Sequence, residues 1–178
     1  MVQSIVDARK TDFEQIRVLA RCYKNQGLNK IYLHWSAGPY NAIAPDYHFS
    51  IDGNGFVYNM NPLDKKLAAT WRRNTGSINI ALMCCADAVC YSEDSVDFGE
   101  YPPTIYQVQA MAKLVCILCE ELDLDIDMDA VLTHGEVADI DGYGIHGEDP
   151  DMRWDLLLLP DSDGVFKPGG QVIRGMAI

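Results

Sequence analysis

Residues 31–37, IYLHWSA, form an apolar and aromatic run that ends in a histidine, a tryptophan and small residues. A short run of β-branched and aromatic side chains of this kind predicts a buried strand over Ile31–Trp35. His34 stands near the carboxyl end of that strand, directly before turn-forming residues. Because functional sites in open α/β sheets gather at the carboxyl ends of strands, His34 is a candidate functional residue.

A second histidine has the same setting. Residues 130–134 predict a short strand that ends at His134, which Gly135 follows. Two such imidazoles could meet over one edge of a sheet, and a third ligand would complete a catalytic zinc site with one position left for water. Asp149 and His146, in the polar loop after His134, are the nearby candidates for that third position.

The remaining pattern places these two strands in an α/β domain. We expect a helix that starts at a Thr11–Glu14 capping box and stops at Gly27, and a long helix that starts at a Thr104–Gln107 capping box. The other expected elements are a hairpin within 46–60, a strand at 77–85, loops at 86–103 and 136–151, and a short final helix at 151–159, anchored by Arg153 and Trp154. This order predicts one sheet covered by helices.

Composition limits the function. The 178 residues are enough for one domain, and a net charge of −12 lacks the surplus of Lys and Arg that neutralises phosphates. Nucleic acid and anionic membrane surfaces are therefore not expected as partners. No apolar run approaches the roughly 18–20 residues of a membrane helix, and the first residues show no signal-peptide pattern. The six cysteines are interpreted as reduced thiols of a protein made in the cytoplasm.

Five stretches in order carry a family resemblance: IYLHWSA, DYHFSIDGNGFVYNM at 46–60, NTGSINIALMCC at 74–85, VLTHGEVA at 131–138 and DPDMRWDL at 149–156. Together they resemble the type 2 N-acetylmuramoyl-L-alanine amidases, a family that includes phage amidase lysozymes and peptidoglycan recognition proteins. The resemblance runs from about residue 30 to 159. It implies a single domain over 1–178, with residues 160–178 as a C-terminal tail.

The resemblance also implies a site. We expect a mixed central sheet flanked by helices, with a zinc ion in a groove at the strand ends. The family's histidine ligands match His34 and His134, and its third ligand, a Cys or Asp before proline, matches Asp149. The family tyrosine matches Tyr47, whose hydroxyl would donate a hydrogen bond to the oxyanion that forms at the scissile carbonyl.

Two positions depart from the family pattern. Some relatives carry a glutamate where this chain has Ala81, and many carry a lysine two residues before the third ligand, where this chain has Gly147. His146 is the best local substitute as a proton carrier, because its ordinary pKa suits transfer near neutrality. Glu136 could instead orient a ligand imidazole.

Trp71, Arg72, Arg73 and Asn74 form the predicted substrate-binding segment. Stem peptides of peptidoglycan carry carboxylates, which arginine can bind in bidentate geometry. The alternative is a surface loop with stray charges.

The resemblance therefore implies a zinc-dependent amidase that hydrolyses the bond between the lactyl group of N-acetylmuramic acid and L-alanine of the stem peptide. The expected setting is a phage or prophage endolysin that reaches the wall after lysis, or a recycling enzyme that acts on wall fragments. Two alternatives stay open: a peptidoglycan-binding protein without activity, and a zinc endopeptidase that cuts within the stem peptide.

Overall fold

A six-stranded mixed sheet forms the centre of the protein. The structure, a computed structural model, describes residues 9–147 and 152–178, and orders the strands β1-β4-β3-β5-β2-β8. Four neighbours run parallel: β3 (Phe49–Ile51), β5 (Ser77–Leu82), β2 (Lys30–Trp35) and β8 (Val131–Thr133). Strands β4 (Val57–Asn59) and β1 (Arg9–Lys10) add antiparallel pairs at one edge.

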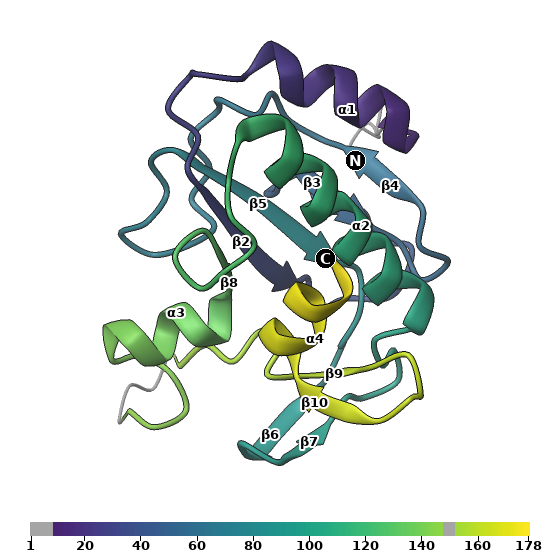
Figure 1. The fold of residues 1–178 in the computed structure, drawn as a ribbon. Helices are drawn as coiled ribbons and strands as arrows, with labels where there is room; N and C mark the ends of the chain where they lie inside the picture. Colours follow the sequence, from purple (N-terminus) through teal and green to yellow (C-terminus); the bar gives the residue numbers. More distant parts are fainter. Residues whose placement is uncertain (1–8, 148–151) are drawn as a thin grey trace, which may run out of the picture.

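Helices flank this sheet, as expected. Figure 1 shows α2 (Ile105–Leu122) lying across the sheet, with α1 (Phe13–Cys22) and α4 (Gly169–Met176) on either side of it. Helix α3 (His134–Asp141) follows β8 directly. Alternation along β2 separates two clusters: Ile31 and Leu33 pack in the main core with α2, whereas Tyr32 packs with residues of β8 and α3. His34 has the same parity as Tyr32, so its side chain leaves the main core.

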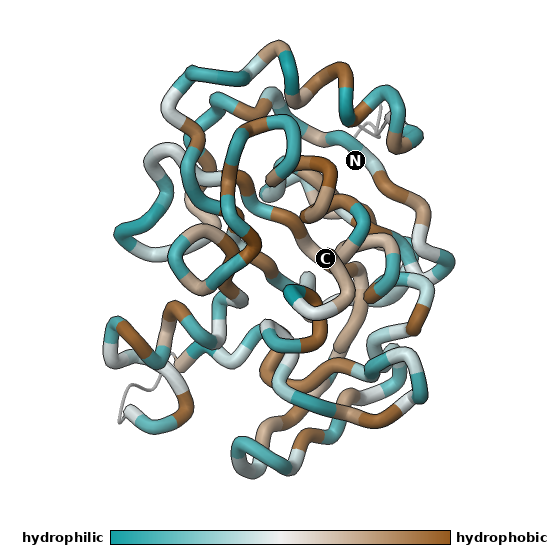
Figure 2. The backbone as a smooth tube through the Cα atoms, in the orientation of Figure 1, coloured by the Kyte–Doolittle hydropathy of each residue, from teal (hydrophilic) through white to brown (hydrophobic). Residues whose placement is uncertain are grey.

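The hydropathy pattern agrees with this arrangement. In Figure 2 hydrophobic residues follow the inner strands and α2, hydrophilic residues gather in the outer loops, and the two kinds alternate along α1. Across the part of the chain that the structure describes, no helix is both long enough and apolar enough to cross a membrane.

The helix starts are only partly as predicted. The capping box of α2 is confirmed at Thr104 and Gln107. The box of α1 lies one residue later than predicted: Asp12 accepts from the Gln15 backbone at 2.8 Å, and the Gln15 side chain accepts from the Asp12 backbone at 3.2 Å. The helix also ends at Cys22 rather than close to Gly27, because the following residues leave the helical conformation.

Three loop or helix predictions are wrong. The predicted loop at 86–103 contains a hairpin of β6 (Val89–Ser92) and β7 (Ser95–Asp97), and the predicted loop after His134 begins with α3. No helix forms in residues 152–159, where Leu156 has a φ of 57° and β9 (Leu158–Pro160) begins. The C-terminal tail pairs β10 (Phe166–Pro168) with β9 and ends in α4, which packs on α2.

An ion-pair cluster joins α1 to α2 and makes the free energy of unfolding depend on pH. The Glu121 carboxylate binds Arg21 at 2.6 Å and Arg17 at 2.6 Å. Hydrogen bonds from Arg21 and then Arg17 lower the pKa of Glu121 from 4.5 to about 2. Because the folded pKa is the lower one, this pair stabilises the fold above about pH 4.5 and loses its effect as the pH falls towards 2.

We therefore expect Glu121→Gln to lower the free energy of unfolding at neutral pH and to flatten its fall between pH 4.5 and 2. Urea unfolding at a series of pH values measures both effects. Glu120→Gln is the matched control, since that side chain is 59% exposed and should change little. Equal pH dependence in parent and Glu121→Gln would contradict the assignment.

Candidate metal centre

Three buried side chains meet at the carboxyl ends of β2 and β8. His34 lies near the end of β2, His134 opens α3 directly after β8, and Asp155 lies in the segment before β9. Because β2 and β8 are parallel neighbours, their carboxyl ends share one edge, as the strand-end argument predicted. The three residues are at most 9% exposed, and one ligand atom from each lies within 4.8 Å of the other two.

The geometry directs ring nitrogens and a carboxylate at one point. His34 Nδ1 lies 3.2 Å from His134 Nδ1, and Asp155 Oδ2 lies 3.5 Å from both nitrogens. The backbone reinforces this arrangement, since Gly135 N donates to Asp155 O at 3.2 Å. A Cβ at Gly135 would approach that oxygen to 3.0 Å, so the glycine permits the close approach of the two segments.

The protonation states suit a cation. Burial lowers the pKa of His34, and the hydrogen bond with Asp155 opposes this only in part. Burial alone would raise the pKa of Asp155, but hydrogen bonds and charge interactions with His134 and His34 lower it overall. Asp155 is therefore a carboxylate at neutral pH. Two imidazole nitrogens and one carboxylate oxygen are a donor set that zinc accepts, with one coordination position left open.

Tyr47 lies beside this group. Its ring centroid is 5.1 Å from that of His34. Burial, followed by the charge of Asp155, raises the pKa of Tyr47 well above its ordinary value. The hydroxyl is therefore protonated at neutral pH and can act as a hydrogen-bond donor.

Two pockets open on either side of His134. The first, here called the Trp71 pocket, measures about 440 Å³ and is lined by Trp71, Arg72, Asn74 and Tyr143. The second, the Tyr47 pocket, measures about 490 Å³ and is lined by Asp46, Tyr47, Asp87, Trp154 and Asp155. Both include Ala68, Ala69, His134 and Arg153. Because the two pockets share these four residues, they adjoin as a groove that passes His134 and Asp155, while His34 lies beneath it and lines neither pocket. Arg72 stands towards one end of the groove, and Asp46 and Asp87 towards the other.

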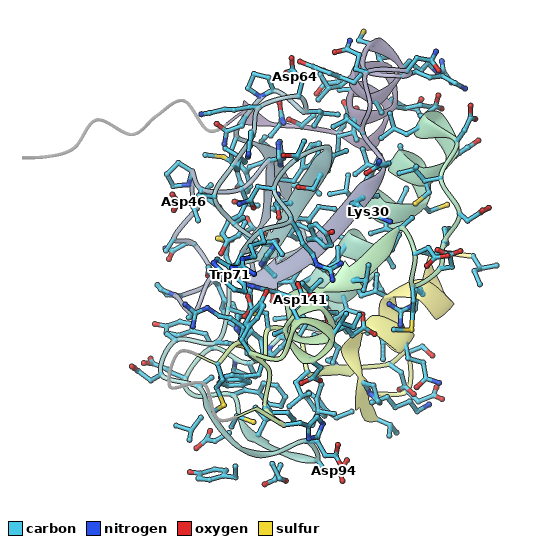
Figure 3. The ribbon with its side chains drawn as sticks, turned by 90° about the vertical axis from the view of Figure 1, so that its left-hand side faces the viewer. Lys30, Asp46, Asp64, Trp71, Asp94 and Asp141 are labelled. Carbon is cyan, nitrogen blue, oxygen red and sulfur yellow. The ribbon has the colours of Figure 1, made fainter. Side chains whose placement is uncertain are left out.

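The predicted substrate-binding segment divides into two parts. Trp71 and Arg72 line the Trp71 pocket, with the Arg72 guanidinium 4.1 Å from the centre of the Trp71 ring. Arg73 instead pairs with Asp141 of α3 through contacts of 2.6 and 2.7 Å, and Figure 3 shows Trp71 next to Asp141. Asn74 lines the same pocket, but its Oδ1 already accepts from the Thr70 backbone.

The other predicted catalytic residues are not brought to the group. His146 is 64% exposed on its side chain, and its Nε2 lies 3.5 Å from Glu93. The Glu136 carboxylate accepts from Thr133 N as part of the α3 capping box and pairs with Arg174 at 2.7 Å. Asp149, the predicted third ligand, lies in the segment 148–151, which is outside the described residues.

Sequence reasoning missed Asp155 and Arg153. Both lie in the quoted DPDMRWDL stretch, but the resemblance directed attention to the aspartate before Pro150. If Asp155 is the third ligand, the position two residues before it is Arg153 rather than Gly147, so a cation stands where many relatives have lysine. The departure at Ala81 remains: this residue is fully buried and pairs with His34 in the sheet register.

The fold and site together define an α/β domain with a buried histidine–histidine–aspartate group at the edge of its sheet. The sequence profile of the family described as N-acetylmuramoyl-L-alanine amidase matches residues 11–151. The chain belongs to this family. No curated protein sequence matches it significantly.

Several solved structures are similar to the chain at low identity. The endolysin amidase LysCS from Clostridium intestinale URNW is 18% identical over 62% of this chain and 71% of its own, with a TM-score of 0.46. The endolysin of Thermus scotoductus bacteriophage Ph2119 is 18% identical over 61% and 71%, with a TM-score of 0.43. Drosophila peptidoglycan recognition protein SD is 19% identical over 72% and 84%, with a TM-score of 0.46.

Proposed function

We propose that this chain is a zinc-dependent N-acetylmuramoyl-L-alanine amidase. It would hydrolyse the amide between the lactyl group of N-acetylmuramic acid and L-alanine in peptidoglycan. The observation that carries the proposal is the buried group of His34, His134 and Asp155, of which His134 and Asp155 line the groove, in a chain of this family. His34 and His134 would hold the zinc through Nδ1, and Asp155 through Oδ2.

Bound zinc would polarise the amide carbonyl and lower the pKa of a coordinated water to about 7. The chain's own residues orient the substrate and stabilise the charge that develops. Tyr47, kept protonated by its surroundings, donates a hydrogen bond to the carbonyl oxygen as that oxygen becomes negative. Arg153, which lines both pockets, supplies positive charge at the point where the two meet.

The charges along the groove indicate which way the stem peptide binds. Arg72 and the indole of Trp71 give one pocket a cation and an apolar surface, which suit a peptide carboxylate and its neighbouring methylene groups. Asp46 and Asp87 give the opposite pocket negative charge. We therefore place the carboxylates of the stem peptide in the Trp71 pocket.

Mass spectrometry of products from purified peptidoglycan tests the reaction. Free stem peptides that begin at L-alanine, with glycan strands that keep their lactyl groups, are the expected products. Peptides cut within the stem would indicate the endopeptidase, and binding without any product would indicate the non-catalytic alternative. His134→Ala is the negative control, because it removes one of the two imidazoles.

The role of Arg153 has its own test. A hydrogen bond to a charged group contributes about 1.5–3 kcal/mol, so Arg153→Gln should lower kcat/KM by roughly 10- to 100-fold. Zinc content should stay at the parent level. His146→Ala is the comparison variant, and from the exposed position of His146 we expect the parent rate. A fall of roughly 10²–10⁴-fold in His146→Ala would restore the sequence-based role of that residue as proton carrier.

A further inference from the structure

The ring nitrogen of His34 that faces away from the metal group contacts two buried side chains. His34 Nε2 lies 2.9 Å from Asn79 Oδ1 and 3.3 Å from Thr70 Oγ1, and the Thr70 hydroxyl also lies 3.0 Å from Asn79 Oδ1. Asn79 comes from the middle of β5, next to β2 in the sheet. His34, Asn79 and Thr70 are at most 1% exposed, so water does not compete for these contacts.

Asn79 is held through both its backbone and its side chain. Its backbone N–H donates to His48 Nδ1 at 2.9 Å, and its carbonyl accepts from His48 N at 2.9 Å. His48 is itself fixed, because its Nε2 donates to Lys65 O at 2.9 Å. The side-chain amide donates from Nδ2 to Ser77 Oγ at 3.4 Å and accepts at Oδ1 from the Thr70 hydroxyl, so it presents its oxygen, not its nitrogen, to His34.

An amide oxygen can only accept a hydrogen bond, so His34 Nε2 must carry the proton. In the neutral imidazole the lone pair is then on Nδ1, the atom that faces His134 and Asp155. The second histidine lacks such a contact: among the described residues His134 Nε2 is buried with no hydrogen-bond partner. The two imidazoles are thus held differently, and only His34 has its tautomer imposed by the fold.

We propose that Asn79 is the positioning residue of this centre, which holds the proton of His34 on Nε2 and aims its Nδ1 lone pair at the metal position. The proposal rests on the proposed function for the identity of the metal. Outer partners of ligand histidines typically change metal affinity by 10- to 100-fold when removed. Thr70 supports Asn79, and since Thr70 lies between Ala69 and Trp71, it joins the segment that lines the Trp71 pocket to the metal ligand.

Four variants separate positioning from packing. Asn79→Leu removes the acceptor at similar volume, and Asn79→Asp keeps an acceptor oxygen. Thr70→Val removes the donor to Asn79 and the longer contact with His34 Nε2, and leaves the Asn79 acceptor in place. Gln107→Leu is the matched control, because Gln107 is another fully buried amide, on α2, whose Nε2 binds only the backbone carbonyls of Ile51 and Met83.

Two measurements avoid any dependence on turnover. Nitrogen NMR of histidine-labelled, metal-free full-length protein reports which ring nitrogen of His34 carries the proton. Competition with a chromogenic chelator gives the dissociation constant for zinc. Asn79→Leu should populate both tautomers and bind zinc 10- to 100-fold more weakly. Asn79→Asp should restore a single Nε2–H tautomer, and Thr70→Val should give a smaller loss of affinity than Asn79→Leu.

Gln107→Leu should lose stability in urea but keep the parent tautomer and zinc affinity. Parent tautomer and affinity in Asn79→Leu would overturn the proposal, as would an equal loss of affinity in Gln107→Leu. If Asn79→Leu does not fold, the other two variants decide: parent zinc affinity in Thr70→Val, or a mixture of His34 tautomers in Asn79→Asp, would also overturn the proposal. Failure of the parent to bind zinc would instead contradict the proposed function, while the tautomer of the metal-free protein would still test Asn79.

Discussion

Asp155→Ala is expected to abolish zinc binding and peptidoglycan hydrolysis. Its carboxylate oxygen lies 3.5 Å from both ligand nitrogens, and the neighbouring histidines keep it ionised. Without it, two imidazoles remain, one ligand short of the three protein ligands that catalytic zinc sites usually have. Metal analysis of the purified variant and release of stem peptides from peptidoglycan measure the two losses.

Asp149→Ala is the decisive comparison, because the family resemblance assigned the third ligand to Asp149. We expect this variant to retain zinc and activity, since Asp155 already completes the group with His34 and His134. The reverse result, full zinc in Asp155→Ala and none in Asp149→Ala, would return the assignment to Asp149. Urea unfolding of both variants separates loss of the ligand from loss of the fold.

Tyr47→Phe is expected to keep zinc and to lower kcat by about 10²–10³-fold, the usual effect of removing one donor to a developing oxyanion. The ring would still occupy its place beside His34, so the change removes the hydroxyl and little else. Steady-state kinetics on soluble muropeptides, with zinc content measured in parallel, give the comparison.

Tyr40→Phe is the matched control for this variant. The Tyr40 hydroxyl donates to the Pro102 carbonyl at 2.7 Å, and neither pocket of the groove includes Tyr40. Its kcat should equal that of the parent. A parent kcat in Tyr47→Phe, or an equal fall in both variants, would show that the Tyr47 hydroxyl does not stabilise the transition state.

The elements that were predicted well carry their own local signals. The apolar run at 31–35 is too short for a helix and rich in strand-forming residues, and the Thr104–Gln107 box satisfies the first free N–H groups of α2 wherever that helix packs. Helix α3 carries mixed signals: the Thr133–Glu136 capping box and Gly142 mark its two ends, but two acidic residues lie in its second turn and a glycine stands at its second position. Its formation depends on the burial of Val137 and Ala138 against Tyr32, which a local pattern does not reveal.

Sequence alone predicted that His34 and His134 meet, because the carboxyl ends of parallel strands share an edge, and both histidines stand there. It also predicted the family, through five stretches in order. The carboxylate that joins the two imidazoles was decided by tertiary structure. Asp155 lies in a segment, residues 152–155, that forms no strand, so side-chain alternation does not predict where it points. The hydrogen bond from Gly135 N to Asp155 O holds Asp155 beside both imidazoles. The same holds for Asn79, whose contact with His34 arises from the pairing of β5 with β2, strands separated by more than forty residues in the chain.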